Sequence, residues 1–239
     1  MQALAEIIMY YRQLLVILIF TLIAGLTASS YPGVTACIVA SEKGRFSITQ
    51  KQLLQEARDR IENKFGPLKS KPTVVFFNER DSFWPLTLNE YGSTSFLGYK
   101  TCVMIGPKGQ NIDVTAHELM HAEIEHRVGY WRRWIELPIW FNEGLAMQVD
   151  HRKRYNLPKG TETSYVKKLN SISDFSVSDH NLLTNHYASA KSEVALWISK
   201  VGTGVLYDLL NSIKEGRSFE SVWQSSKREQ TNSSSGSSR

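Results

Sequence analysis

The 239-residue sequence contains only two cysteines, Cys37 and Cys102. Two isolated cysteines lack the close spacing of a cysteine-ligated zinc site, which argues against that kind of metal binding. Each lies in a run typical of a strand, residues 35–39 and 101–105. In an exported protein such a pair persists as a disulfide, because the compartment is oxidising. We therefore predict a Cys37–Cys102 disulfide that joins two strands of one sheet.

Charge is absent from a long N-terminal stretch, since no charged residue occurs between Arg12 and Glu42. Within it, residues 14–28 read LLVILIFTLIAGLTA. This run is shorter than the roughly 20 residues of a typical membrane-spanning helix. Small residues follow at 28–30, as at a signal-peptide cleavage site. We interpret residues 1–30 as a signal peptide, or as a signal anchor if they are retained. The rest of the chain is then periplasmic or extracellular, and a retained segment would tie it to the inner membrane.

No segment interleaves basic residues with aromatic ones, and the net charge is only +5. The sequence therefore lacks the footprint of a nucleic-acid-binding protein, and we predict no nucleic-acid partner. Hydrophobic residues make up 42% of the chain, as in a folded globular protein. Residues 225–239 have no apolar side chain and are predicted to be a disordered tail. We expect residues 31–224 to form a single domain.

Hydrophobic periodicity predicts that all the strands lie in the first half of the chain and that the second half is helical. A helix over 49–65 precedes a strand at 72–77 and a strand pair within 93–106 that turns near Gly98. The remaining helices are predicted at 112–127 with Asp113 as N-cap, and at 139–149, 187–201, 203–214 and 219–223. This order indicates an α+β fold, with a small mixed sheet and a helical C-terminal half.

The predicted helix at 112–127 contains the motif HELMH, which places His117 and His121 four residues apart. Residues at i and i+4 share one face of a helix, so both imidazoles can reach one zinc ion at about 2.0–2.1 Å. Glu118 is turned about 100° from His117, beside the ion rather than on it. That is the position of a general base that takes a proton from water.

A third ligand is expected because a catalytic zinc usually has three protein ligands and one open position. The next predicted helix reads WFNEGLA over residues 140–146 and carries Glu143. Residues 122–142 leave room for a turn and an antiparallel return. Gly144 would let the two helices approach closely, because it has no side chain. The sequence thus predicts one Zn²⁺ held by His117, His121 and Glu143.

The pair HELMH and WFNEGLA resembles the gluzincin metallopeptidases, the clan of thermolysin and the aminopeptidase-N-type enzymes. It is closest to the compact peptidase MA-like domains of bacterial exported proteins, and the resemblance covers residues 93–223. It implies that His117, His121 and Glu143 bind zinc and that Glu118 is the base. It also implies an edge strand that pairs with the substrate backbone. That strand is expected at Thr101–Gly106, which makes Cys102, Val103 and Met104 substrate-binding residues.

The resemblance further implies a tyrosine or histidine from a later helix that stabilises the developing oxyanion. Tyr187, expected to open its helix, is the candidate, with His186 behind it; a half-buried packing role for Tyr187 is the alternative. The Gly-x-Met-Glu-Asn motif of the aminopeptidase branch is absent, which favours an endopeptidase. The gap between the two motifs is wider than in that branch, so residues 130–138 are predicted to form an extra loop.

Several residues near the motifs have weaker predicted roles. Glu125 and Asp150 are candidates to orient an imidazole, although we expect Glu125 to be exposed. His126, His151 and His180 are expected at the surface or as capping residues. Residues 131–134, WRRW, are expected to form a packed loop with its arginines in water, or else a lid or a membrane-surface contact.

Together these patterns predict an exported zinc metallopeptidase. Zinc-activated water, with Glu118 as general base, would hydrolyse a peptide or protein substrate. Two alternatives stay open: a zinc-stabilised binding module without turnover, and an envelope-assembly factor whose helical part, residues 187–223, binds a partner.

Overall fold

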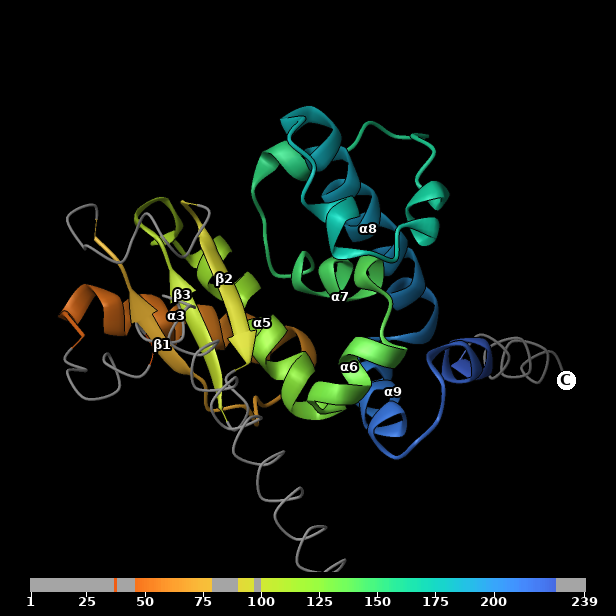
Figure 1. Ribbon diagram of the computed structural model, residues 1–239, viewed down its shortest axis with the longest axis horizontal. Helices are drawn as coiled ribbons and strands as arrows, with labels where there is room; N and C mark the ends of the chain where they lie inside the picture. Colours follow the sequence, from red (N-terminus) through yellow and green to blue (C-terminus); the bar gives the residue numbers. More distant parts are fainter. Residues whose placement is uncertain (1–36, 38–45, 79–89, 97–99, 227–239) are drawn as a thin grey trace, which may run out of the picture.

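The computed structural model describes residues 37, 46–78, 90–96 and 100–226 (Figure 1). The predicted signal segment, most of the predicted strand at 35–39 and the turn at Gly98 lie outside this part. The α+β prediction is confirmed: a small mixed sheet is followed by a helical C-terminal half. Among the described residues, no helix combines the length and apolar character needed to cross a membrane.

Helix α3 (Ile48–Phe65) begins at a capping box, in which Ser47 and Gln50 bond each other's backbone N–H groups. These two bonds satisfy donors that the first helical turn leaves unpaired. The helix buries Ala57, Ile61 and Phe65. It ends at Gly66, whose φ of 91° favours glycine.

Three strands form the sheet: β1 (Thr73–Phe76), β2 (Gly92–Phe96) and β3 (Thr101–Ile105). β3 lies in the middle, parallel to β1 and antiparallel to β2. Because side chains alternate between the faces of a strand, Val103 and Ile105 enter the main core beside α5. Cys102 and Met104 instead pack with Val75, Phe77 and Cys37 on the opposite face.

The prediction that Thr101–Gly106 forms the edge strand is wrong. Cys102, Val103 and Met104 pair with residues 73–75 of β1 on one side and with residues 93–95 of β2 on the other. A central strand has no free edge for a substrate backbone. Within the described part of the chain, the strand at the sheet edge beside α5 is β2. The strand order depends on β1, which is distant in sequence, so local patterning did not reveal it.

The predicted disulfide between Cys37 and Cys102 is confirmed, with 6.3 Å between the two Cα atoms. Cys37, however, has helical rather than strand conformation. The bond therefore joins a helical residue to the central strand and does not link two strands of one sheet.

Helix α5 (Ile112–Val128) lies at the centre of the fold, in contact with the sheet, α3 and the C-terminal helices (Figure 1). Its N-cap is Asn111, whose side chain accepts a hydrogen bond from Val114 N at 3.0 Å. The predicted cap, Asp113, instead pairs with Arg60 and accepts a bond from His151 N.

The helical half differs from prediction mainly at element ends. A helix, α6 (Tyr130–Glu136), replaces the loop predicted at 130–138, and α7 (Ile139–Ala146) stops before Val149. α8 (His180–Val201) begins earlier than predicted because Asp179 caps it. The remaining elements are α9 (Val205–Lys214), a helix at 219–226, and the 3₁₀ turns η1 (Pro107–Gly109), η2 (Lys153–Tyr155), η3 (Ser164–Lys168) and η4 (Ile172–Phe175).

The predicted start of the disordered tail at residue 225 is wrong. Residues 225 and 226 continue the last helix, and Ser226 is buried. Its hydroxyl accepts a hydrogen bond from Trp197 Nε1 at 3.1 Å. This contact attaches the last helix to α8, next to the aromatic cluster of Phe141, Trp197 and Trp223. Residues 227–239 lie outside the described part.

Candidate metal centre

Helix α5 is buried almost all round, and its buried residues include seven polar or charged side chains: Thr115, His117, Glu118, His121, Glu123, Glu125 and Arg127. Burying such groups costs free energy unless each has a partner. The partners of Glu123 serve the fold: its carboxylate accepts hydrogen bonds from Lys69 N, Ser70 N and Arg127 Nε. The two histidines and Glu118 form a different group, which faces α7 and β2.

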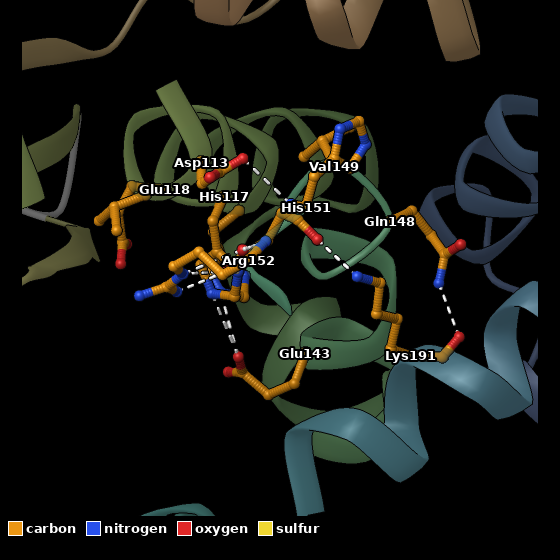
Figure 2. Close-up of polar contacts among 12 residues, drawn as sticks. Asp113, His117, Glu118, Glu143, Gln148, Val149, His151, Arg152 and Lys191 are labelled. Carbon is orange, nitrogen blue, oxygen red and sulfur yellow. Dashed lines mark hydrogen bonds and ion pairs between the residues drawn. The ribbon is translucent and has the colours of Figure 1, made fainter. Parts of the chain in front are cut away.

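His117 and His121 from α5 meet Glu143 from α7, and their ligand atoms all lie within 4.8 Å of one another. The two Nε2 atoms are 3.1 Å apart. Glu143 Oε2 lies 3.6 Å from His117 Nε2 and 3.3 Å from His121 Nε2. Figure 2 shows the Glu143 carboxylate directed at His117. The structure therefore brings together the three residues that the sequence predicted as ligands.

These distances match the donor geometry of a tetrahedral zinc ion. Bonds of about 2.0–2.1 Å at tetrahedral angles separate ligand atoms by about 3.4 Å. The observed separations of 3.1, 3.3 and 3.6 Å lie around this value. The donor set is also appropriate, because two imidazole nitrogens and one carboxylate oxygen are common zinc ligands. The residues present thus fit one Zn²⁺.

The charges within the cluster favour a cation there. Burial alone would raise the pKa of Glu143, but the neighbouring His121 and the hydrogen bonds from both histidines hold it well below its usual value. Burial alone would lower the pKa of His121, but the charges of Glu143 and Glu118 outweigh it, so that the pKa is raised. An ionised carboxylate therefore sits against two nitrogens that attract either a proton or a metal ion.

Glu118 lies beside the cluster and not within it, and its carboxylate turns toward the edge strand β2. Thr94 Oγ1 lies 2.8 Å from Glu118 Oε2 and 2.9 Å from the Glu118 carbonyl oxygen. The hydroxyl has one proton, so it donates to one of these acceptors at a time. A Cβ added at Gly92 would lie 3.0 Å from Glu118 Cγ and 3.0 Å from the Met104 carbonyl oxygen. Gly92 therefore leaves the space that Glu118 occupies.

Asp150 stands behind His117, with Oδ2 4.0 Å from His117 Nδ1. It is fully buried and ion-paired with Arg152, whose Nε lies 2.9 Å from each carboxylate oxygen. Burial would raise the pKa of Asp150, but the bonds and charge of Arg152 lower it. Asp150 is thus an ionised carboxylate on the side of His117 away from the cluster; at 4.0 Å it acts on the imidazole through its charge and not through a hydrogen bond.

The segment that follows α7 is fixed on both sides, which positions Asp150. Lys191 Nζ on α8 donates to the Asp150 carbonyl oxygen at 2.6 Å, and Gln148 Nε2 donates to the Lys191 carbonyl oxygen at 2.8 Å. On the other side, His151 N donates to Asp113 of α5 (Figure 2). These bonds hold residues 148–151 between α5 and α8.

Tyr187 adjoins the cluster, with its ring centroid 6.3 Å from that of His117. It lies within α8 and does not open the helix, and its ring also packs on Tyr155 and Phe175. Burial, together with the charges of Glu143 and Glu118, raises the pKa of Tyr187 well above its usual value, so its hydroxyl keeps its proton. His186 faces elsewhere, because its Nδ1 lies 2.8 Å from the Asp174 carbonyl oxygen.

Two sequence-based interpretations near the site are wrong. Gly144 does allow a close helix contact, but with α8 rather than α5: an added Cβ would lie 2.5 Å from the Ala190 carbonyl oxygen. Glu125 is buried and not exposed, and the Thr101 hydroxyl donates a hydrogen bond to its carboxylate at 2.8 Å. Burial raises the pKa of Glu125.

The three histidines expected at the surface, His126, His151 and His180, are exposed.

Sequence reasoning missed Thr94, Gly92 and Arg152. Thr94 and Gly92 come from a strand distant from HELMH, and nothing in their local pattern relates them to Glu118. Arg152 carried a usable signal, because it lies two residues after Asp150 on a segment that follows the second motif. Comparison with known proteins found no matching family model, curated protein or solved structure.

Proposed function

We propose that this protein is a zinc-dependent peptidase of the gluzincin type. The convergence of His117, His121 and Glu143 at tetrahedral spacing carries the proposal, with Glu118 beside this cluster and outside it. A site that only needed to hold zinc for stability would not require an additional acidic side chain at that position. The gluzincin resemblance of HELMH and WFNEGLA supports the same assignment.

Bound zinc would supply Lewis-acid polarisation of the peptide carbonyl and would lower the pKa of the attacking water. The chain's own residues would move the protons. Glu118 Oε1 would accept a proton from the water, while Thr94 holds Oε2 by its hydroxyl. Glu118 would then pass that proton to the leaving amine. Tyr187, whose raised pKa keeps it protonated, would donate a hydrogen bond to the developing oxyanion.

The substrate class follows from the strand beside the site. Within the described residues, positions 93–96 of β2 pair with β3 along one edge, and Thr94 hydrogen-bonds Glu118. An extended peptide that adds to the other edge of β2 would bring a peptide bond next to Glu118. This role replaces the one predicted for Cys102, Val103 and Met104. Strand addition accepts internal stretches of a polypeptide, which supports endopeptidase activity.

The compartment is part of the proposal. The Cys37–Cys102 disulfide is compatible with export, because such bonds persist in oxidising compartments. The apolar run at residues 14–28 supports the same location.

The decisive experiment combines metal analysis with peptide cleavage on the full chain. Elemental analysis should give one zinc per chain, and mass spectrometry of a peptide mixture should reveal internal cleavage. Glu118→Gln should keep its zinc and lose activity by roughly 10²–10⁴-fold, the usual contribution of a general base. Glu56→Gln, an exposed change on α3, is the matched control and should behave as wild type.

The outcomes separate the alternatives. Zinc at one per chain without any cleavage would favour the zinc-stabilised binding module or the assembly factor over a peptidase. Equal activity in wild type and Glu118→Gln would contradict the role of Glu118 as base. Protein that folds and binds no zinc would contradict the metal site itself.

A further inference from the structure

Helix α6 exposes an unusual amount of apolar surface. Trp131, Trp134 and Ile135 have exposed fractions of 74%, 45% and 75%. They occupy positions i, i+3 and i+4, so they share one face of the helix. We call this the α6 face. The other large hydrophobic side chains exposed in the described chain, such as Ile172 and Leu196, lie on other elements.

The α6 face continues into the end of the edge strand. Tyr130 packs against Trp131 and Trp134, with ring centroids 5.1 and 6.3 Å away. Tyr130 also stacks on Phe96, the last residue of β2, at 4.2 Å. Contiguous exposed apolar and aromatic surface of this kind marks an interaction site in soluble proteins. Tryptophan and tyrosine beside polar groups are typical of side chains at a membrane–water boundary.

Basic residues lie on the same helix and beside it, and Arg132 lies 3.7 Å from Glu136. Arg132 and Arg133 lie on the same helix, and Glu136 is its only acidic residue. The Arg133 guanidinium lies 4.7 Å from the Trp134 ring centroid. Arg132 reaches the carbonyl of Arg217, which adds a third basic residue nearby. Arginine next to exposed aromatic rings favours an anionic lipid headgroup, because the rings and the apolar arginine stems can enter the interface while the charged heads stay among the phosphates.

The covalent connections place the same end of the sheet near a membrane whenever the N-terminal segment is retained. Phe96 pairs with Thr101, and the next pair in register is Ser95 with Cys102. Cys102 is bonded to Cys37. Residue 28, the last of the apolar run, lies at most about 30 Å of extended chain from Cys37. An anchor over residues 14–28 would therefore hold this end of the sheet, and the α6 face beside it, close to the bilayer.

We propose that the α6 face docks on an anionic phospholipid bilayer, with Trp131, Trp134 and Ile135 in the headgroup region and the arginines among the phosphates. Docking would place the Phe96 end of β2 at the lipid surface. In Figure 1, α6 joins α5 to α7 and lies next to α9. The inference does not depend on the proposed peptidase activity. If that activity holds, polypeptide emerging from the membrane would meet β2 first.

The test uses the full chain reconstituted into vesicles of phosphatidylglycerol and phosphatidylcholine. Ile135→Cys is labelled with a fluorophore, and Ile172→Cys, an exposed isoleucine on η4, is the matched control. A lipid with a nitroxide near its headgroup should quench the label at position 135 severalfold more than the label at 172. Adding Trp131→Ser and Trp134→Ser, lowering the phosphatidylglycerol content or raising the salt should each reduce that quenching. A single reactive thiol per chain verifies that the native disulfide is intact.

Equal quenching at both positions, with full access of iodide to position 135, would overturn the proposal. Protection from iodide without quenching by lipid would also overturn it, because protein would then cover the face. Protection that depends on protein concentration would identify a second copy as the cover, and protection that does not would identify a segment of the same chain. Zinc content and peptide cleavage are measured separately, so their failure leaves this result interpretable.

Discussion

Thr94 and Glu118 meet across the junction between the sheet and the central helix, with the hydroxyl 2.8 Å from the carboxylate. Thr94→Val removes the donor and keeps the shape. A hydrogen bond to a charged group contributes about 1.5–3 kcal/mol, so kcat should fall by roughly 10- to 100-fold while zinc is retained. Thr101→Val, on the neighbouring strand β3, is the matched control, because it breaks the corresponding hydrogen bond to Glu125 of α5. Equal losses in both variants would contradict a specific role for Thr94.

Asp150→Asn should weaken zinc binding rather than the chemical step. The change removes the charge that faces His117 Nδ1 and leaves Arg152 without its partner. Loss of such a partner typically lowers metal affinity by about 10- to 100-fold. Competition with a chromogenic chelator measures this directly. Asp59→Asn, at an exposed position on α3, should leave the affinity unchanged.

The metal-free and zinc-loaded proteins should respond to pH in opposite directions. Without zinc, the raised pKa of His121 stabilises the fold below the ordinary value of 6.5, and this contribution is lost as the pH rises through the folded pKa. The lowered pKa of Glu143 adds stability above 4.5 that is lost as the pH falls. Apoprotein should therefore be most stable between these values. Zinc needs neutral imidazole, so the loaded protein should gain stability over the same rise in pH.

Thermal unfolding, with chelator or with zinc, measures both stability curves. A range of about pH 4 to 8 spans the ordinary carboxyl and imidazole pKa values. His121→Ala should flatten the upper part of the apoprotein curve. A parallel rise of both curves with pH would contradict the assignment of His121 and Glu143 as a coupled pair.

Gly144→Ala should destabilise the fold and disturb the metal site together. The added Cβ would overlap the Ala190 carbonyl oxygen on α8, which is backbone and cannot rotate away. Overpacking of this kind costs about 1–3 kcal/mol. It should also shift Glu143, the preceding residue, and so lower zinc affinity. Gly204→Ala, in a helical conformation with open space around it, should be neutral or slightly stabilising.

Much of the site was accessible from the sequence because it is local. The spacing of His117 and His121 depends only on helical periodicity. Glu143 lies on α7, the apolar helix predicted next, so the three side chains could be placed together from the sequence pattern. Their role as zinc ligands stays a prediction. The span of α3 was predicted for the same reason, whereas its capping box at Ser47 and Gln50 was not.

The remainder depends on contacts between distant segments. The position of β3 in the sheet is decided by β1, which inserts on its far side, and no alternation within residues 101–106 encodes that. The same holds for Thr94 and Glu118, which are paired by the docking of β2 on α5. Burial of Glu125 follows from Thr101 in the same way. The close contact of Gly144 required the position of α8, which begins 36 residues later in the chain.

The residues that would hold the metal all belong to one helical hairpin, 117–143, whereas the carboxylate proposed to move protons is oriented by a strand outside it. Loading and turnover are consequently separable traits of this architecture. A variant with a changed β2 could keep a fully occupied metal site and have no activity. Selection that acted on the hairpin alone would then not restore the activity. Among proteins that share the hairpin unchanged, substitutions at positions 92 and 94 would therefore distinguish catalytically active proteins from inactive ones.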